Sequence, residues 1–160
     1  MSSTGADRYR RGLYTFIRRT VPYPSMAAFD APSREICTLR RIRTNTPLQA
    51  FVTLNDPVYV EAAQALARRI VREGGATAED RARYGLRLCL CRPPQPGQVC
   101  ELVKLYEEDL ARYRADAQAA VAMATKPLGP LPPGADPAEL AAWTVVANVL
   151  LNLDAVLTKG

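Results

Sequence analysis

The chain has 160 residues, 48% of them hydrophobic and 23% charged, with a net charge of +5, which is typical of a single soluble globular domain. It contains no histidine, so a Ser-His-Asp or Cys-His mechanism, a zincin site or haem ligation through histidine cannot be built from this chain alone. No apolar run approaches the ~20 residues of a membrane span. No basic-then-apolar leader begins the chain, so we expect the signal of an exported protein to lie outside it.

The basic character of the chain belongs to its first quarter. Residues 1–43 hold nine arginines, no lysine and three acidic residues, a net charge of +6, whereas the remainder holds 12 basic and 13 acidic residues, a net charge of −1. Tyr9, Leu13 and Phe16 fall at helical spacing and predict a short helix that ends before Pro22. Residues 21–36 show no clear period, so we expect an ordered but irregular segment.

Start and stop signals predict five helices after this arm. Thr46, Pro47 and Gln49 form a capping box, and Asp56 with the proline after it repeats the cap-plus-proline pattern. The predicted ranges are 47–54, 57–73, about 78–91, 97–124 and 137–157. Because the last of these is apolar nearly all round, it should be the central helix, covered by the others.

No internal repeat and no convincing strand appears, so we predict an all-α fold. It would be an irregular bundle of four to six helices with an extended, loop-rich N-terminal arm. We expect a single domain over 1–160. Its parts are an arginine-rich arm (1–45), helices (46–125), a semi-rigid proline-rich linker (126–135) and the C-terminal helix (136–157).

The cysteines lack the paired C-x-x-C spacing of a zinc site and the C-x-x-C-H that attaches haem. We therefore expect no metal and no cofactor in this chain. Buried free thiols are the favoured state, and a disulfide between Cys91 and Cys100 is the alternative. The four cysteines are Cys37, Cys89, Cys91 and Cys100.

Motifs spread along most of the chain resemble the C-terminal planctomycete-specific domain of large exported proteins, a family of unknown function. The most specific motifs are FDAPSRE, RTNTPLQA with LNDP, and LLNLD, whereas Cys91 stands where relatives more usually have glycine in Gly-Arg-Pro-Pro. The resemblance implies a cell-envelope or extracellular location and a C-terminal excerpt of a larger domain. In that family the domain follows a cytochrome-c-like domain, so any haem would lie on another domain of the parent protein.

The arginines at the end of the arm have two interpretations. They could form an anion pocket beside a helix N-terminus, or they could tie the arm down by pairing with acids, which we favour because an irregular segment must satisfy its backbone groups. The anion- or ligand-binding candidates are Arg34, Arg40, Arg41, Arg43, Asn45 and Asn55. The structural ion-pair candidates are Asp30, Glu35, Asp56 and Asp154.

Polar residues also interrupt the apolar last helix. Asn148 and Asn152 are four apart and share a face, and we expect a structural role in which N-terminal arginines are the partners. An arginine bridge to Asp154 would join the two ends of the chain.

These features favour a non-catalytic interaction or scaffolding module whose partners are the other domains of its parent protein. Without histidine or a recognisable catalytic motif, an enzyme is disfavoured. The alternative is part of an extracellular enzyme or binder that holds an anionic, sulfated polysaccharide through the arginines. Nucleic-acid binding is disfavoured, because the basic residues form no dense tract.

Overall fold

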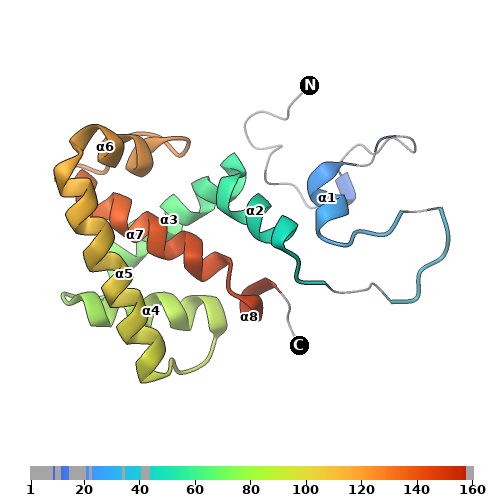
Figure 1. The fold of residues 1–160 in the computed structure, drawn as a ribbon, viewed down its shortest axis with the longest axis horizontal. Helices are drawn as coiled ribbons and strands as arrows, with labels where there is room; N and C mark the ends of the chain where they lie inside the picture. Colours follow the sequence, from blue (N-terminus) through green and yellow to red (C-terminus); the bar gives the residue numbers. More distant parts are fainter. Residues whose placement is uncertain are drawn as a thin grey trace. The chain divides into compact units, whose positions relative to one another are not determined.

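The computed structural model describes residues 9, 12–14, 21, 23–33, 35–40 and 44–157. These residues form eight α-helices and a short 3-10 turn, η2 (Gly12–Tyr14), without a β-strand, which confirms the predicted all-α fold (Figure 1). The helices are α1 (Pro24–Ala28), α2 (Pro47–Asn55), α3 (Pro57–Glu73), α4 (Ala78–Leu90), α5 (Pro96–Ala115), α6 (Ala117–Thr125), α7 (Pro137–Leu151) and α8 (Asp154–Leu157).

The described helices outnumber the four to six expected, because two predicted helices are each divided and α1 lies in the segment expected to be irregular. The predicted helix 97–124 breaks at Asp116, whose backbone leaves the helical region (φ −130°, ψ 88°). The Asp116 carboxylate then accepts a hydrogen bond from the Ala119 N–H (2.9 Å) and caps α6. Because the apolar residues keep their helical spacing across Asp116, the sequence pattern predicted one continuous helix instead of two. The predicted helix 137–157 likewise ends at Asn152, before α8.

The chain divides into two compact units, residues 1–52 (the N-terminal unit) and residues 53–160 (the helical unit), with the boundary inside α2. In the helical unit, α7 is central as expected, since it contacts α3, α4, α5, α6 and α8. Trp143 of α7 is fully buried and stacks on Tyr106 of α5, with ring centroids 4.6 Å apart. Gly85 of α4 allows a close approach, because a Cβ there would lie 2.9 Å from side-chain carbons of both Ile70 and Leu150.

A polar clamp from α3 fixes the segment that leads from α6 to α7. The amide of Gln64, which is fully buried, donates to the carbonyls of Met123 (2.5 Å) and Lys126 (2.7 Å). Its oxygen accepts from the Leu128 N–H (3.0 Å). One turn later, Arg68 donates to the carbonyls of Ala124 (3.3 Å) and Gly129 (2.8 Å). The predicted linker is therefore held in place by α3.

None of the described helices combines the length and apolar character that crossing a membrane requires.

Replacing Gln64 by methionine keeps the side-chain volume but removes the hydrogen-bond partner of the Met123 and Lys126 carbonyls and of the Leu128 N–H. We expect Gln64→Met to lower the free energy of unfolding by about 2–4 kcal/mol, measured by urea denaturation. Gln118→Met, at an exposed position of α6, is the matched control and should change it by less than about 0.5 kcal/mol. Equal effects of the two substitutions would contradict the role of the clamp.

Candidate functional site

The N-terminal unit is fastened by a network centred on Gln49, the only buried side chain among its described residues. The predicted capping box is present: the Thr46 N–H donates to the Gln49 side-chain oxygen (3.2 Å), and the Gln49 N–H donates to the Thr46 hydroxyl (3.3 Å). The Gln49 amide nitrogen then donates to the carbonyl of Ala28 (2.8 Å) and to the Thr44 hydroxyl (3.1 Å). The capping residue Gln49 therefore also holds Ala28, which lies 21 residues earlier in the chain.

Asp30 completes this network. Its carboxylate accepts hydrogen bonds from the N–H (2.8 Å) and the hydroxyl (2.7 Å) of Thr44. Its backbone is left-handed (φ 55°), which aspartate tolerates better than most residues. Asp30 thus binds the chain segment that follows the arginines, and its predicted pairing with an arginine stays a prediction.

The described part of the chain places most of the other predicted site residues at exposed positions. Arg34, Arg41 and Arg43 lie outside the described residues, so their convergence on an anion stays a prediction. The remaining candidates in the N-terminal unit and α2 are all exposed: Glu35, Arg40, Asn45 and Asn55. Asp56 caps α3 by accepting from the Val58 N–H (2.8 Å), as the sequence predicts. Asp154 is exposed at the start of α8.

Asn148 of α7 and Asn152, which follows α7, have structural partners, but these differ from the predicted arginines. The Asn148 amide donates to the carbonyl of Leu54 (3.4 Å), and Asn152 accepts a hydrogen bond from the hydroxyl of Thr53 (2.7 Å). Sequence reasoning missed these partners because both lie nearly a hundred residues earlier in the chain.

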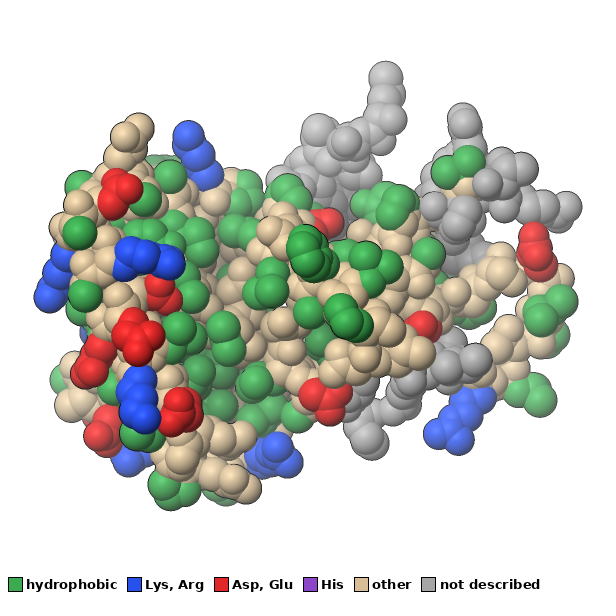
Figure 2. Space-filling view, viewed as in Figure 1, with side chains coloured by type: hydrophobic (Ala, Val, Ile, Leu, Met, Phe, Trp, Pro, Cys, Tyr) green, Lys and Arg blue, Asp and Glu red, His purple; other side chains and the backbone are tan. Residues whose placement is uncertain are grey.

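Helix α2 is inverted: it buries polar side chains and exposes apolar ones. Gln49 and Thr53 are four residues apart and only 2% and 0% exposed. Leu48, Phe51 and Leu54 recur every three residues and are 63%, 71% and 42% exposed. We call these three residues the outer face of α2, and hydrophobic side chains gather over this helix in Figure 2. An apolar surface of this kind is a candidate for contact with another molecule.

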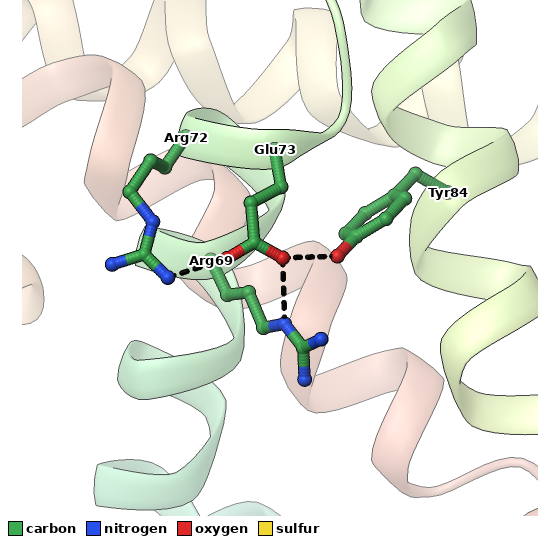
Figure 3. A network of polar contacts seen from close by, with 4 residues as sticks. All are labelled: Arg69, Arg72, Glu73 and Tyr84. Carbon is green, nitrogen blue, oxygen red and sulfur yellow. Dashed lines mark hydrogen bonds and ion pairs between the residues drawn. The ribbon is translucent and has the colours of Figure 1, made fainter.

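A charged network joins the end of α3 to α4 (Figure 3). The Tyr84 hydroxyl and Arg69 (2.9 Å) both donate to one Glu73 carboxylate oxygen, and Arg72 (2.5 Å) donates to the other. These three donors lower the pKa of Glu73 from 4.5 to about 2, with the tyrosine contributing most. The same hydrogen bond raises the pKa of Tyr84. The network satisfies both oxygens of the Glu73 carboxylate and joins the end of α3 to α4.

Asp109 of α5 is a buried carboxylate, and burial raises its pKa despite the opposing effect of Arg112, 2.8 Å away. Arg112 also lies over the ring of Tyr113 and donates to its hydroxyl (3.2 Å). We interpret this arrangement as a local ion pair within α5, in which Asp109 and Tyr113 hold the Arg112 side chain in place.

All four cysteines are free thiols, which agrees with the expectation that they form no disulfide. The expectation that these thiols are buried is wrong. Cys37, Cys91 and Cys100 are exposed, and Cys89 is half-buried. Cys91 ends α4 in a left-handed conformation (φ 53°), which glycine adopts more readily than cysteine. No group of three or more potential metal ligands occurs among the residues that the model places.

Glu73→Gln should destabilise the helical unit in a pH-dependent way. A folded-state pKa of about 2, below the ordinary 4.5, means that the carboxylate contributes stability above about pH 4.5 and loses it as the pH falls toward 2. The difference in urea midpoint between the wild type and Glu73→Gln should therefore be largest near about pH 7 and shrink below about pH 4.5.

The control is Glu79→Gln, because Glu79 is an exposed carboxylate that pairs with the exposed Arg83 at 3.4 Å. Its substitution should have a small effect at either pH. A Glu73→Gln difference of unchanged size at about pH 3 would contradict the assigned ionisation.

Gln49→Met should release the fastening of the N-terminal unit. The Thr44 amide is protected because Asp30 and Gln49 hold residues 28–30 and 44–49 together. We expect its hydrogen exchange to accelerate about tenfold or more in Gln49→Met, while amides of α7 keep the wild-type rate. Leu48→Met, at the exposed neighbouring position, should leave the Thr44 amide unchanged.

Residues 1–106 match the model of a family described as PSD1, protein of unknown function (DUF1553). No curated protein and no solved structure matches the chain. The match covers well over half of the sequence and confirms the expected membership of a family of unknown function. The chain belongs to the PSD1 family (DUF1553).

Proposed function

We propose that this chain is a non-catalytic interaction or scaffolding module that binds its partner through the N-terminal unit. The proposal is supported mainly by one observation: among the described residues of that unit, no hydrophobic side chain is buried. Every buried hydrophobic residue of the described chain lies between Ala63 and Leu150. Of the twelve large hydrophobic side chains that are exposed among the described residues, nine lie in residues 1–52, and Leu39 is the most exposed.

Because most large hydrophobic side chains described in this unit are exposed, they contribute little of the hydrophobic free energy that normally offsets chain ordering. Gln49 and Asp30 supply hydrogen bonds in its place. Exposed apolar surface beside arginine and aromatic residues is the composition that protein–protein interfaces favour. Because residues 44–52 carry no charge, the unit has the net charge of +6 found for residues 1–43, which suits an acidic partner surface.

The setting of the module is part of the proposal. We propose that it works in the cell envelope or outside the cell, as a part of a larger exported planctomycete protein. Cytochrome-c-like domains of the same protein would carry any haem, and those domains are the first candidate partners. The support for this setting is the sequence resemblance described above.

The arginine content also favours a second candidate function, the binding of an anionic, sulfated polysaccharide. Nine arginines without a lysine provide forked donors that match sulfate oxygens. Such binding would be saturable and would weaken as salt screens the charges.

Site-specific photo-crosslinking tests the main proposal. A photoreactive residue at Leu39, introduced into the natural full-length protein in the cells that make it, should give a discrete protein adduct or an intramolecular link to another domain. The same residue at Val121, an exposed apolar position of α6, should give none. Adducts of equal yield at the two positions, or none at Leu39, would reject the N-terminal unit as an interaction surface.

Titration with sulfated and unsulfated oligosaccharides at low and moderate salt tests the second candidate. Binding that requires sulfate and is lost in Arg40→Glu would favour the polysaccharide binder. Equal heats for sulfated and unsulfated chains would exclude it.

A further inference from the structure

One stretch of the N-terminal unit, residues 36–40, lies entirely on the surface, and we call it the exposed segment. All five of its residues are exposed, and Figure 1 draws them without helix or strand. Leu39 and Ile36 are the two most exposed of the large hydrophobic side chains described. None of the five residues forms a hydrogen bond or an ion pair with any described part of the chain. Their backbone N–H and C=O groups are therefore available to another molecule.

The exposed segment belongs to a loop whose two ends are fastened. The Asp30 carboxylate accepts hydrogen bonds from the N–H (2.8 Å) and the hydroxyl (2.7 Å) of Thr44, fourteen residues later. Gln49 adds hydrogen bonds to Ala28 (2.8 Å) and to Thr44 (3.1 Å). Because this fastening involves none of residues 36–40, the segment can straighten without breaking a hydrogen bond of the unit. A loop that is already closed also loses less conformational entropy on binding.

The spacing of the apolar side chains decides how such a segment can be bound. Ile36 and Leu39 are three residues apart, so an extended chain directs them to opposite sides. A single apolar groove would therefore cover only one of them. The open edge of a β-sheet suits both, because an added strand places alternate side chains on the two faces of the sheet.

The composition of the segment also suits a strand. Ile36 and Thr38 are β-branched, and neither glycine nor proline occurs from residue 33 to residue 46. Five residues are about the length of a typical strand. Arg40 is exposed and has no ion pair with any described residue, so an acidic side chain beside the sheet edge would be its complement.

We propose that residues 36–40 bind by strand addition, in which their main chain pairs with the open edge of a β-sheet in the partner, next to acidic side chains of that partner. The inference rests on the proposed interaction role and specifies how the N-terminal unit binds. An open sheet edge presents unpaired N–H and C=O groups, which the exposed segment would satisfy. In a strand, the N–H groups of consecutive residues point to opposite edges, so only alternate residues of the segment would be paired.

Proline substitutions test this pairing, with the photo-crosslink at Leu39 in the natural full-length protein as the measurement. Cys37→Pro and Thr38→Pro each remove one N–H, and in a strand these two N–H groups point to opposite edges. One of the two substitutions should lower the adduct yield at least about fivefold relative to alanine at the same position, because a carbonyl of the partner loses its donor. The other should change the yield by less than about twofold, because its N–H faces water.

The pattern across the two variants separates strand addition from other modes of binding. A loss in both would indicate that the segment binds as a helix, and a loss in neither would indicate binding through side chains alone. Either result overturns strand addition. Hydrogen exchange of the Thr44 amide should keep the wild-type rate in both variants, and faster exchange would show that the segment is part of the fastening, which also overturns the inference.

Arg40→Glu tests the charge of the partner's sheet edge. The adduct yield at Leu39 should fall at low salt, and added salt should reduce the difference from the wild type. A yield that is unchanged or higher would overturn the acidic edge.

The same measurement distinguishes this inference from the proposed function. Absence of an adduct at Leu39 in the otherwise unchanged protein would reject both. An adduct that forms equally in the two proline variants would leave the proposed function standing and overturn strand addition alone.

Discussion

The fold depends on enclosing α7. This helix is apolar on nearly every side, so water must be excluded around its whole circumference, and α3, α4, α5 and α6 all contact it. Small side chains make that enclosure tight, because Ala63 and Ala67 of α3 and Ala120 of α6 are fully buried. Trp143 is fully buried and stacks on Tyr106. The core thus combines one large indole with small alanine side chains and with larger aliphatic ones such as Ile70, Leu86 and Leu150.

Segments that bury few apolar side chains are held in place mainly by hydrogen bonds. Gln64 and Arg68 hold the α6–α7 segment through its carbonyl groups, and Gln49 holds residues 28 and 44 in the same manner. Buried amides are directional, so they fix which way a helix faces. For α2 that requirement places the polar face inward and leaves the apolar face exposed.

The properties relevant to function coincide in one part of the chain. The first 52 residues carry the net charge of +6 and most of the exposed hydrophobic side chains, whereas the helical unit carries a net charge of −1 and all the buried ones among the residues described. This separation is consistent with the proposal that the helical unit provides stability and the N-terminal unit provides the interaction surface. Family membership agrees with a domain of unknown function and supports neither a reaction nor a cofactor.

The sequence by itself determined the helical class, the starts of α2, α3, α4 and α7, and the central place of α7, because capping residues and apolar periodicity act over a few residues. It could not reveal the inverted α2, since Leu48 and Gln49 are neighbours in the chain and only distant hydrogen-bond partners decide which of them turns inward. The same limit applies to Thr53 with Asn152 and to Gln64 with Lys126, contacts that join residues far apart in sequence. Tertiary structure decided those contacts because a buried polar group must find a partner wherever the fold provides one.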